Sequence, residues 1–244
     1  GDLARAASRD PGDRETLDAL ERAAAGAQRV EDALALLTTL AQAPGGRVTA
    51  PVAASRLLAS TGRMENAVEM VGRALAVAAD DPGALAQQAS IFADAGDLER
   101  LEPAVRRLET VAPNGAETLY YGATLAFMSQ QADKAIRLAQ RVVATDPRHA
   151  RAHNLLGAAL ASLGKVDEAR QAFQTSLELN PKDATPYINL GSLELLDAAN
   201  PSAAVGHFTE ALALDPGSAA ARDGLIRALE ATGNHARAAR LRAR

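Results

Sequence analysis

The chain has 244 residues, a formal net charge of -4, no Cys, no Trp, three Tyr and four Phe. Without Cys it has no disulfide, thiolate metal site or Cys nucleophile, and its acidic charge is not that of a nucleic-acid-binding protein. No uninterrupted apolar run approaches the ~20 residues that cross a bilayer, and the charged first ten residues do not resemble a signal peptide. The Ala-rich composition favours closely packed helices over a sheet.

An internal repeat of about 34 residues organises the chain. Leu101 and six alanines recur at steps of 34 or 35, namely Ala33, Ala67, Ala135, Ala169, Ala204 and Ala238. A second row with the same spacing contains Gly62, Gly96, Gln130, Gly164 and Gly233, and a third contains Pro113, Pro147, Pro181 and Pro216. Three rows that agree on one period indicate a repeat protein.

The phase of these rows divides the chain from end to end. It predicts the end of a truncated preceding repeat at 1–13, six repeats at 14–47, 48–81, 82–115, 116–149, 150–183 and 184–218, and a partial repeat at 219–244. The truncated start suggests a piece of a longer protein whose unsealed N-terminal repeat could self-associate. At the other end, Arg237, Arg240, Arg242 and Arg244 make the last predicted helix basic.

Each repeat is predicted to contain two helices, because apolar residues recur at spacings of three and four on either side of the Gly row. Gly164 is expected in the left-handed conformation that ends a helix. The first helix of 48–81 should begin near Ala50 to Pro51. The repeat 184–218 has one additional residue, just before Asn200 and Pro201, which we expect to cap and begin its second helix.

Two repeats carry several residues of a known signature. One has Leu156-Gly157, Ala169, Phe173 and Pro181, and the other has Tyr187, Leu190-Gly191, Ala204, Phe208 and Pro216. This pattern resembles the tetratricopeptide repeat, a helix–turn–helix of 34 residues. The resemblance implies an all-α, right-handed superhelical solenoid of antiparallel helix pairs. It also implies a non-catalytic protein, without cofactor, that binds a protein or peptide in a concave groove lined by the first helix of each repeat.

The candidate groove residues are the first-helix positions that do not face neighbouring repeats. Tyr120, Thr124, Phe127 and Met128 share one face of the fourth repeat, where Leu119, Ala123 and Ala126 already supply a packing stripe. An exposed aromatic and Met face is typical of an anchor for a partner, although for Tyr121 and Phe127 packing against the next repeat is the favoured interpretation. The full candidate set is Tyr120, Tyr121, Thr124, Phe127, Met128, Arg151, Asn154, Asn189, Arg56 and Arg227.

Other sites find less support in the sequence. His149 and His153 have a zinc-compatible spacing, but we expect His149 to precede a helix and His153 to be structural. Charge pairs on second helices, such as Asp167 with Arg170, are interpreted as solvated faces. No nucleophile–base set and no phosphate-binding loop can be assembled, so we predict no catalytic residue, metal or cofactor.

The sequence leaves the partner and the context open. The preferred function is an interaction scaffold. The alternative is an accessory domain of a larger enzyme or of a membrane-anchored or secretion assembly protein, whose active part lies outside this chain. A pentatricopeptide-type RNA binder would need a basic groove, which Glu15, Asp18 and Asp223 argue against. Many Ala and Arg with only three Lys suggest a bacterial source, and a Cys-free chain suits cytoplasm and periplasm alike.

Overall fold

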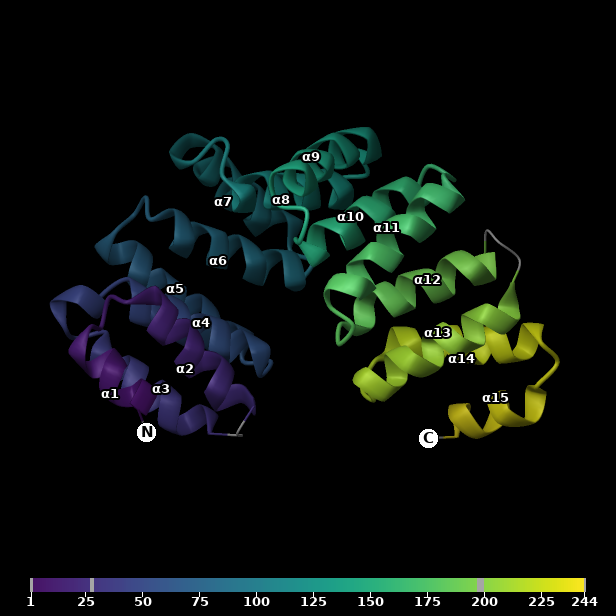
Figure 1. Ribbon diagram of the computed structural model, residues 1–244, viewed down its shortest axis with the longest axis horizontal. Helices are drawn as coiled ribbons and strands as arrows, with labels where there is room; N and C mark the ends of the chain where they lie inside the picture. The colour runs from purple at the N-terminus through teal and green to yellow at the C-terminus, as the bar shows by residue number, and fades with distance from the viewer. Residues whose placement is uncertain (1, 27–28, 197–199, 244) are drawn as a thin grey trace. The chain divides into compact units, whose positions relative to one another are not determined.

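The computed structural model describes residues 2–26, 29–196 and 200–243 (Figure 1). These residues form fifteen α-helices and one short 3₁₀ turn, and they contain no strand. The chain divides into two compact units, Gly1–Tyr121 and Gly122–Arg244. The predicted all-α fold is confirmed. The additional residue expected before Asn200 lies outside the described residues.

The first unit contains seven helices and the beginning of an eighth. They are α1 (Asp2–Arg9), α2 (Arg14–Gly26), α3 (Val30–Leu40), α4 (Thr49–Ser60), α5 (Met64–Val77), α6 (Pro82–Asp94) and α7 (Leu98–Val111), followed by the start of α8 (Ala116–Met128). The 3₁₀ turn, Pro44–Gly46, lies between α3 and α4. We call α2, α4 and α6 first helices, and α3, α5 and α7 second helices. Successive first helices contact one another, as do the two helices of each pair.

The second unit contains the end of α8 and seven further helices. They are α9 (Ala132–Thr145), α10 (Ala150–Ala161), α11 (Val166–Leu179), α12 (Ala184–Leu196), α13 (Pro201–Leu214), α14 (Ala219–Ala231) and α15 (His235–Arg242). The helices α8, α10, α12 and α14 are first helices in the same sense, and the odd-numbered ones are second helices. Contacts join α10 with α11, α12 with α13, and α14 with α15, and Figure 1 shows α10 and α11 side by side.

A left-handed residue ends the first helix of most pairs. Gly62, Gly96, Gly164 and Gly233 have φ between 69° and 77°, which confirms the expectation for Gly164. Gln130 occupies the equivalent place after α8 with φ 60°, and it is the only non-Gly residue with positive φ in the described chain. Glycine has no steric penalty in this conformation, whereas Gln does.

The repeating alanines form the thin core of the helix pairs. Leu101 and all six alanines of the row from Ala33 to Ala238 are at most 4% exposed. Each lies in the first half of a second helix, where a methyl group lets the neighbouring helix approach closely. The core therefore depends on small side chains, as the composition indicates.

Two phenylalanines fill the wider parts of the second unit's core, each against glycine. A Cβ added at Gly157 would lie 2.6 Å from the Phe173 ring, and one added at Gly224 would lie 2.3 Å from the Phe208 ring. Phe208 is also the neighbour of Gly191. The Gly positions of the repeat signature are thus the surfaces on which these rings rest.

Helix ends follow the sequence closely. The Asn200 side chain accepts a hydrogen bond of 3.2 Å from the Ala203 amide, and Pro201 is the first residue of α13, as expected. The helix α4 begins at Thr49, one residue before the predicted start. This places Pro51 in the first turn, where its missing N–H costs no helical hydrogen bond.

Replacing Gly224 by Ala should destabilise the second unit by about 1–3 kcal/mol, because its methyl group would overlap the buried Phe208 ring. The matched control is Gly206→Ala on α13, an exposed site with no atom within 4 Å of the added Cβ. That change should stabilise the helix by about 0.5–1 kcal/mol. Thermal unfolding followed by circular dichroism measures both, and an equal effect of the two variants would contradict the proposed role of Gly224.

Replacing Gln130 by Gly should stabilise the chain by about 1 kcal/mol, because Gly relieves the left-handed backbone at this position. The reverse change at the equivalent position, Gly164→Gln, should destabilise by a similar amount. Shifts in melting temperature of about 2–4 °C in opposite directions are expected. A lower melting temperature for the Gln130→Gly variant would show that other contacts of Gln130 outweigh backbone strain.

Candidate functional site

Two amide side chains meet on successive first helices of the second unit. The Asn189 Nδ2 of α12 donates to the Asn154 Oδ1 of α10 at 2.9 Å, and both side chains are half-buried. The two residues are 35 positions apart in the sequence, and the repeat period alone does not predict their hydrogen bond. Each amide retains donor and acceptor capacity beyond this one bond.

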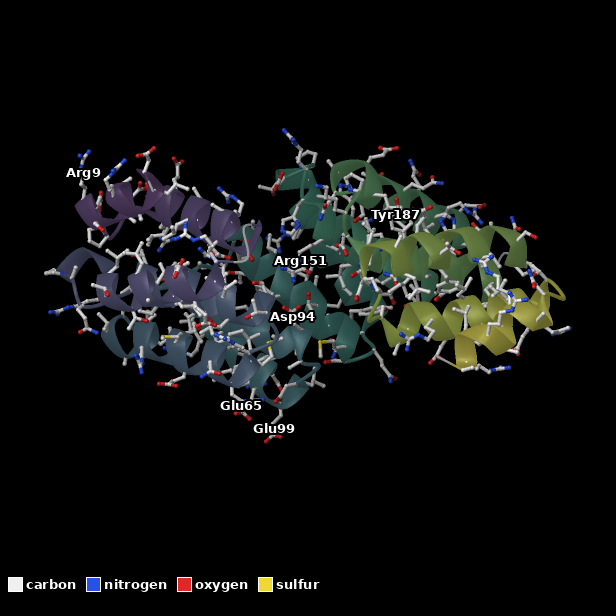
Figure 2. The ribbon with its side chains drawn as sticks, turned by 90° about the horizontal axis from the view of Figure 1, so that it is seen from below. Arg9, Glu65, Asp94, Glu99, Arg151 and Tyr187 are labelled. Carbon is white, nitrogen blue, oxygen red and sulfur yellow. The ribbon has the colours of Figure 1, made fainter. Side chains whose placement is uncertain are left out.

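Arginines lie on first helices of the same unit. Arg151 near the start of α10 and Arg227 on α14 are exposed; Arg151 is labelled in Figure 2. Arg227 borders an open hollow of about 440 Å³ together with Asp223, Ile226 and Arg242. Arg242 bonds to Glu230 at 2.6 Å, so the basic last helix is partly compensated by α14.

The predicted aromatic face of α8 is only partly available at the surface. Tyr120 and Tyr121 are 7% and 3% exposed, and their rings meet edge to face with centroids 5.1 Å apart. The expectation that Tyr120 is an exposed anchor is therefore wrong, and the packing interpretation holds for Tyr121. The remaining predicted residues of α8, Thr124, Phe127 and Met128, are half-buried, and Phe127 packs against the core of the second unit.

Arg56 in the first unit is engaged in an ion-pair network. Its guanidinium donates to Glu21 through Nε at 2.9 Å and to Asp18 through Nη2, both on α2. Burial raises the pKa of the Glu21 carboxyl above its usual range, and the nearby Arg56 only partly opposes this effect. Arg56 thus serves first to link α4 with α2.

A partly buried ion pair links two repeats of the second unit. Arg170 on α11 donates through Nε to Glu194 on α12 at 2.7 Å, and the Glu194 side chain is only 8% exposed. The hydrogen bond with Glu194 raises the pKa of Arg170. The interpretation of Asp167 and Arg170 as a merely solvated pair is corrected, because Arg170 also holds this buried carboxylate.

Other charged side chains of second helices are solvated. Glu65 and Glu99, at the starts of α5 and α7, are exposed and point away from the ribbon (Figure 2).

The histidines at 149 and 153 have structural roles. His149 precedes α10, and its Nδ1 accepts a hydrogen bond from the Ala152 amide at 3.1 Å. The His153 Nε2 lies 3.0 Å from the Pro147 carbonyl oxygen. Among the described residues, no group of three or more His, Asp or Glu side chains is placed to hold a metal ion. No described helix is long and apolar enough to cross a membrane.

Comparisons with known proteins agree with this geometry. The sequence profile of the tetratricopeptide repeat family matches residues 122–184 and 191–242. The second unit contains tetratricopeptide repeats. Members of this family typically mediate protein–protein interactions. No curated protein matches the sequence.

Solved structures support the fold over most of the chain. A repeat protein from Parabacteroides merdae has a TM-score of 0.70 at 16% identity, covering 93% of this chain and 90% of its own. A protein from Thermus thermophilus gives 0.63 at 20% identity, covering 75% of this chain and 97% of its own. The crystal structure of the APC/C hetero-tetramer Cut9–Hcn1 gives 0.75 at 19% identity and covers 93% of this chain. The chain spans 45% of the length of that last match.

Acidification should destabilise the second unit through His207. Burial lowers the pKa of His207 below its ordinary value, and the nearby Glu194 opposes this shift more weakly. The unfolded chain therefore binds a proton near pH 6.5, while the folded chain binds it only at lower pH. The stability that the neutral ring supports is present above about pH 6.5 and is lost as the pH falls towards the folded pKa.

The test is the pH dependence of the melting temperature between about pH 7.5 and 5.5, the window in which an unfolded His gains its proton. His207→Gln should reduce the loss of stability on acidification. His235→Gln, at an exposed site on α15, is the matched control and should keep the wild-type slope. Equal slopes for wild type and His207→Gln would assign the acid sensitivity to other groups.

Proposed function

We propose that this chain is a non-catalytic scaffold that binds a protein or peptide on the first helices of its second unit. The proposed surface is lined by Thr124, Phe127, Met128, Arg151, Asn154, Asn189 and Arg227. Tyr120 and Tyr121 are left out because they are buried, and Arg56 because two carboxylates already engage it. Self-association through the N-terminal repeat stays a prediction that size-exclusion chromatography with light scattering can test.

The Asn154–Asn189 pair is the observation that carries the proposal. The bond between the two amides aligns polar groups from successive repeats on one surface. An extended peptide has an unpaired N–H and C=O at every residue, and amide side chains can bind both. Because the two side chains are half-buried and held by each other, little conformational entropy is lost when they bind a partner.

Neighbouring residues supply the other elements of an interface. Met128 and Phe127 offer half-buried apolar contacts, and Met adapts well to varied partners. The exposed Arg151 and Arg227 can add charge-assisted hydrogen bonds with a partner's carboxylates. The combination of apolar and polar groups on successive first helices is typical of a protein-binding surface.

The test starts from peptides selected by display on the immobilised full chain, with affinity measured by fluorescence anisotropy. The double variant Asn154→Ala and Asn189→Ala should weaken binding by about fivefold or more, as expected for loss of at least one hydrogen bond. The matched control is Gln174→Ala, which removes an exposed amide from the second helix α11.

Three outcomes are decisive for this proposal. Weaker binding in the Asn variant, with the Gln174→Ala control unchanged, supports the first-helix surface of the second unit. Unchanged binding in the Asn variant would contradict it, and so would loss of binding in the control alone. Circular dichroism of each variant verifies that the helices remain folded.

A further inference from the structure

A hollow of about 150 Å³ lies on the first helices of the first unit. Its apolar lining consists of Leu17, Val48 and Val52, and its polar lining of Arg14, Asp18, Thr49, Arg56, Asp81 and Gly83. These residues come from α2, from α4 and the residue before it, and from the start of α6. The hollow thus combines an apolar floor with carboxylates at its rim.

The chain's own Arg14 places a guanidinium at this rim. Its Nη2 lies 3.2 Å from the Asp81 Oδ2, and 61% of its side chain is exposed. Gly83 makes room for it, since a Cβ there would lie only 3.3 Å from the Arg14 Nη1. The Asp81 carboxylate is fixed independently of Arg14, because its Oδ1 caps α6 by accepting from the Ala84 amide at 2.8 Å. A guanidinium therefore fits beside Asp81 and Gly83, and Arg14 is held there by one exposed contact.

The charges of the lining balance only while Arg14 stays on Asp81. Asp18 and Glu21 share Arg56, and Arg22 also lowers the pKa of Glu21, whereas Asp81 is paired with Arg14. Residues 1–121 as a whole carry 12 basic and 18 acidic side chains, a net charge of -6, whereas residues 122–244 carry 14 and 12, a net charge of +2. The first unit therefore attracts cations.

A lining of this kind matches an Arg side chain better than other residue types. Arg has an apolar stem that can lie on Leu17, Val48 and Val52, and a charged head that can reach Asp81. Its planar guanidinium pairs with carboxylates in two parallel hydrogen bonds. An apolar side chain would remove the rim charges from water without replacing their hydration, and an acidic one would be repelled by Asp18 and Asp81.

We propose that this hollow binds an Arg side chain of a partner peptide, whose guanidinium replaces that of Arg14 on Asp81. The inference rests on the proposed peptide-binding function of the first helices and adds a preference for a basic residue in the segment that crosses the first unit. Arg14 acts in this scheme as an internal competitor. Its removal should strengthen binding, whereas removal of a purely structural contact would not.

The probes are three blocked tripeptides that differ only in the central residue, Ac-Ala-Arg-Ala-NH₂ and its citrulline and Glu analogues. Citrulline keeps the shape of Arg but has no charge. Binding to the full chain is followed by NMR of ¹³C-labelled methyl groups, with Leu17, Val48 and Val52 as reporters. The Arg peptide should shift these methyl signals in a saturable way, and the other two should bind at least about fivefold more weakly. Equal binding of the citrulline peptide would overturn the proposal.

Two variants test the roles of Arg14 and Asp81. Arg14→Ala should strengthen binding of the Arg peptide by up to about fivefold, which is the equilibrium equivalent of one exposed ion pair. Asp81→Asn should weaken binding by a similar factor, while its amide oxygen still caps α6. The matched control is Glu102→Gln, which removes an exposed ion pair with Arg106 on the second helix α7. Weaker or unchanged binding in Arg14→Ala would overturn the proposal.

Failure of the proposed Arg site can be distinguished from failure of the proposed function. If the display-selected peptides depend on Asn154 and Asn189 but the tripeptides fail these tests, the hollow is overturned and the second-unit surface stands. If the tripeptides behave as expected while the Asn variant binds peptides normally, the second-unit surface is overturned and the hollow stands.

Discussion

Close approach between helices is the constraint on which the rest of this structure depends. Every second helix contributes one almost fully buried small or aliphatic residue at the same phase, most often Ala. At the Ala positions a larger side chain would separate the helices of a pair and, because each pair stacks on the next, the displacement would pass along the unit. The first helices lie on the opposite side of these contacts, and their surface is consequently available for other uses.

Features that recur in every repeat were predictable from the sequence, because residues 34 positions apart lie in the same environment in successive repeats. The buried alanines, the left-handed glycines and the cap formed by Asn200 and Pro201 are local requirements of backbone and side-chain size. Each can be inferred from residue type and phase without knowledge of the neighbouring repeat. The two helix starts that these signals predict, those of α4 and α13, lie within about a residue of the observed ones, the ordinary disagreement between assignments.

Contacts that occur once were not predictable in this way. Tyr120 looked surplus to the packing stripe of α8, yet it is buried with its ring against Tyr121. The bond between Asn154 and Asn189 depends on the rotation of α10 relative to α12, which periodicity does not encode. Likewise, Arg170 reaches the buried Glu194 only because its long side chain crosses from one repeat to the next. The expectation that failed is the exposure of the most prominent aromatic residue, Tyr120; the location of the site on first helices stays a prediction.

The ion pair between Arg14 and Asp81 has a consequence for folding. It joins α2 to the cap of α6, which belong to helical hairpins separated in the chain by the hairpin of α4 and α5. Stability in repeat proteins is usually described by intrinsic terms and nearest-neighbour interfaces. A bond between hairpins that are not neighbours adds a next-nearest-neighbour term to the free energy of unfolding. The unfolding of the first hairpin is therefore coupled directly to that of the third. The first unit should then lose its hairpins with greater cooperativity than a nearest-neighbour description gives.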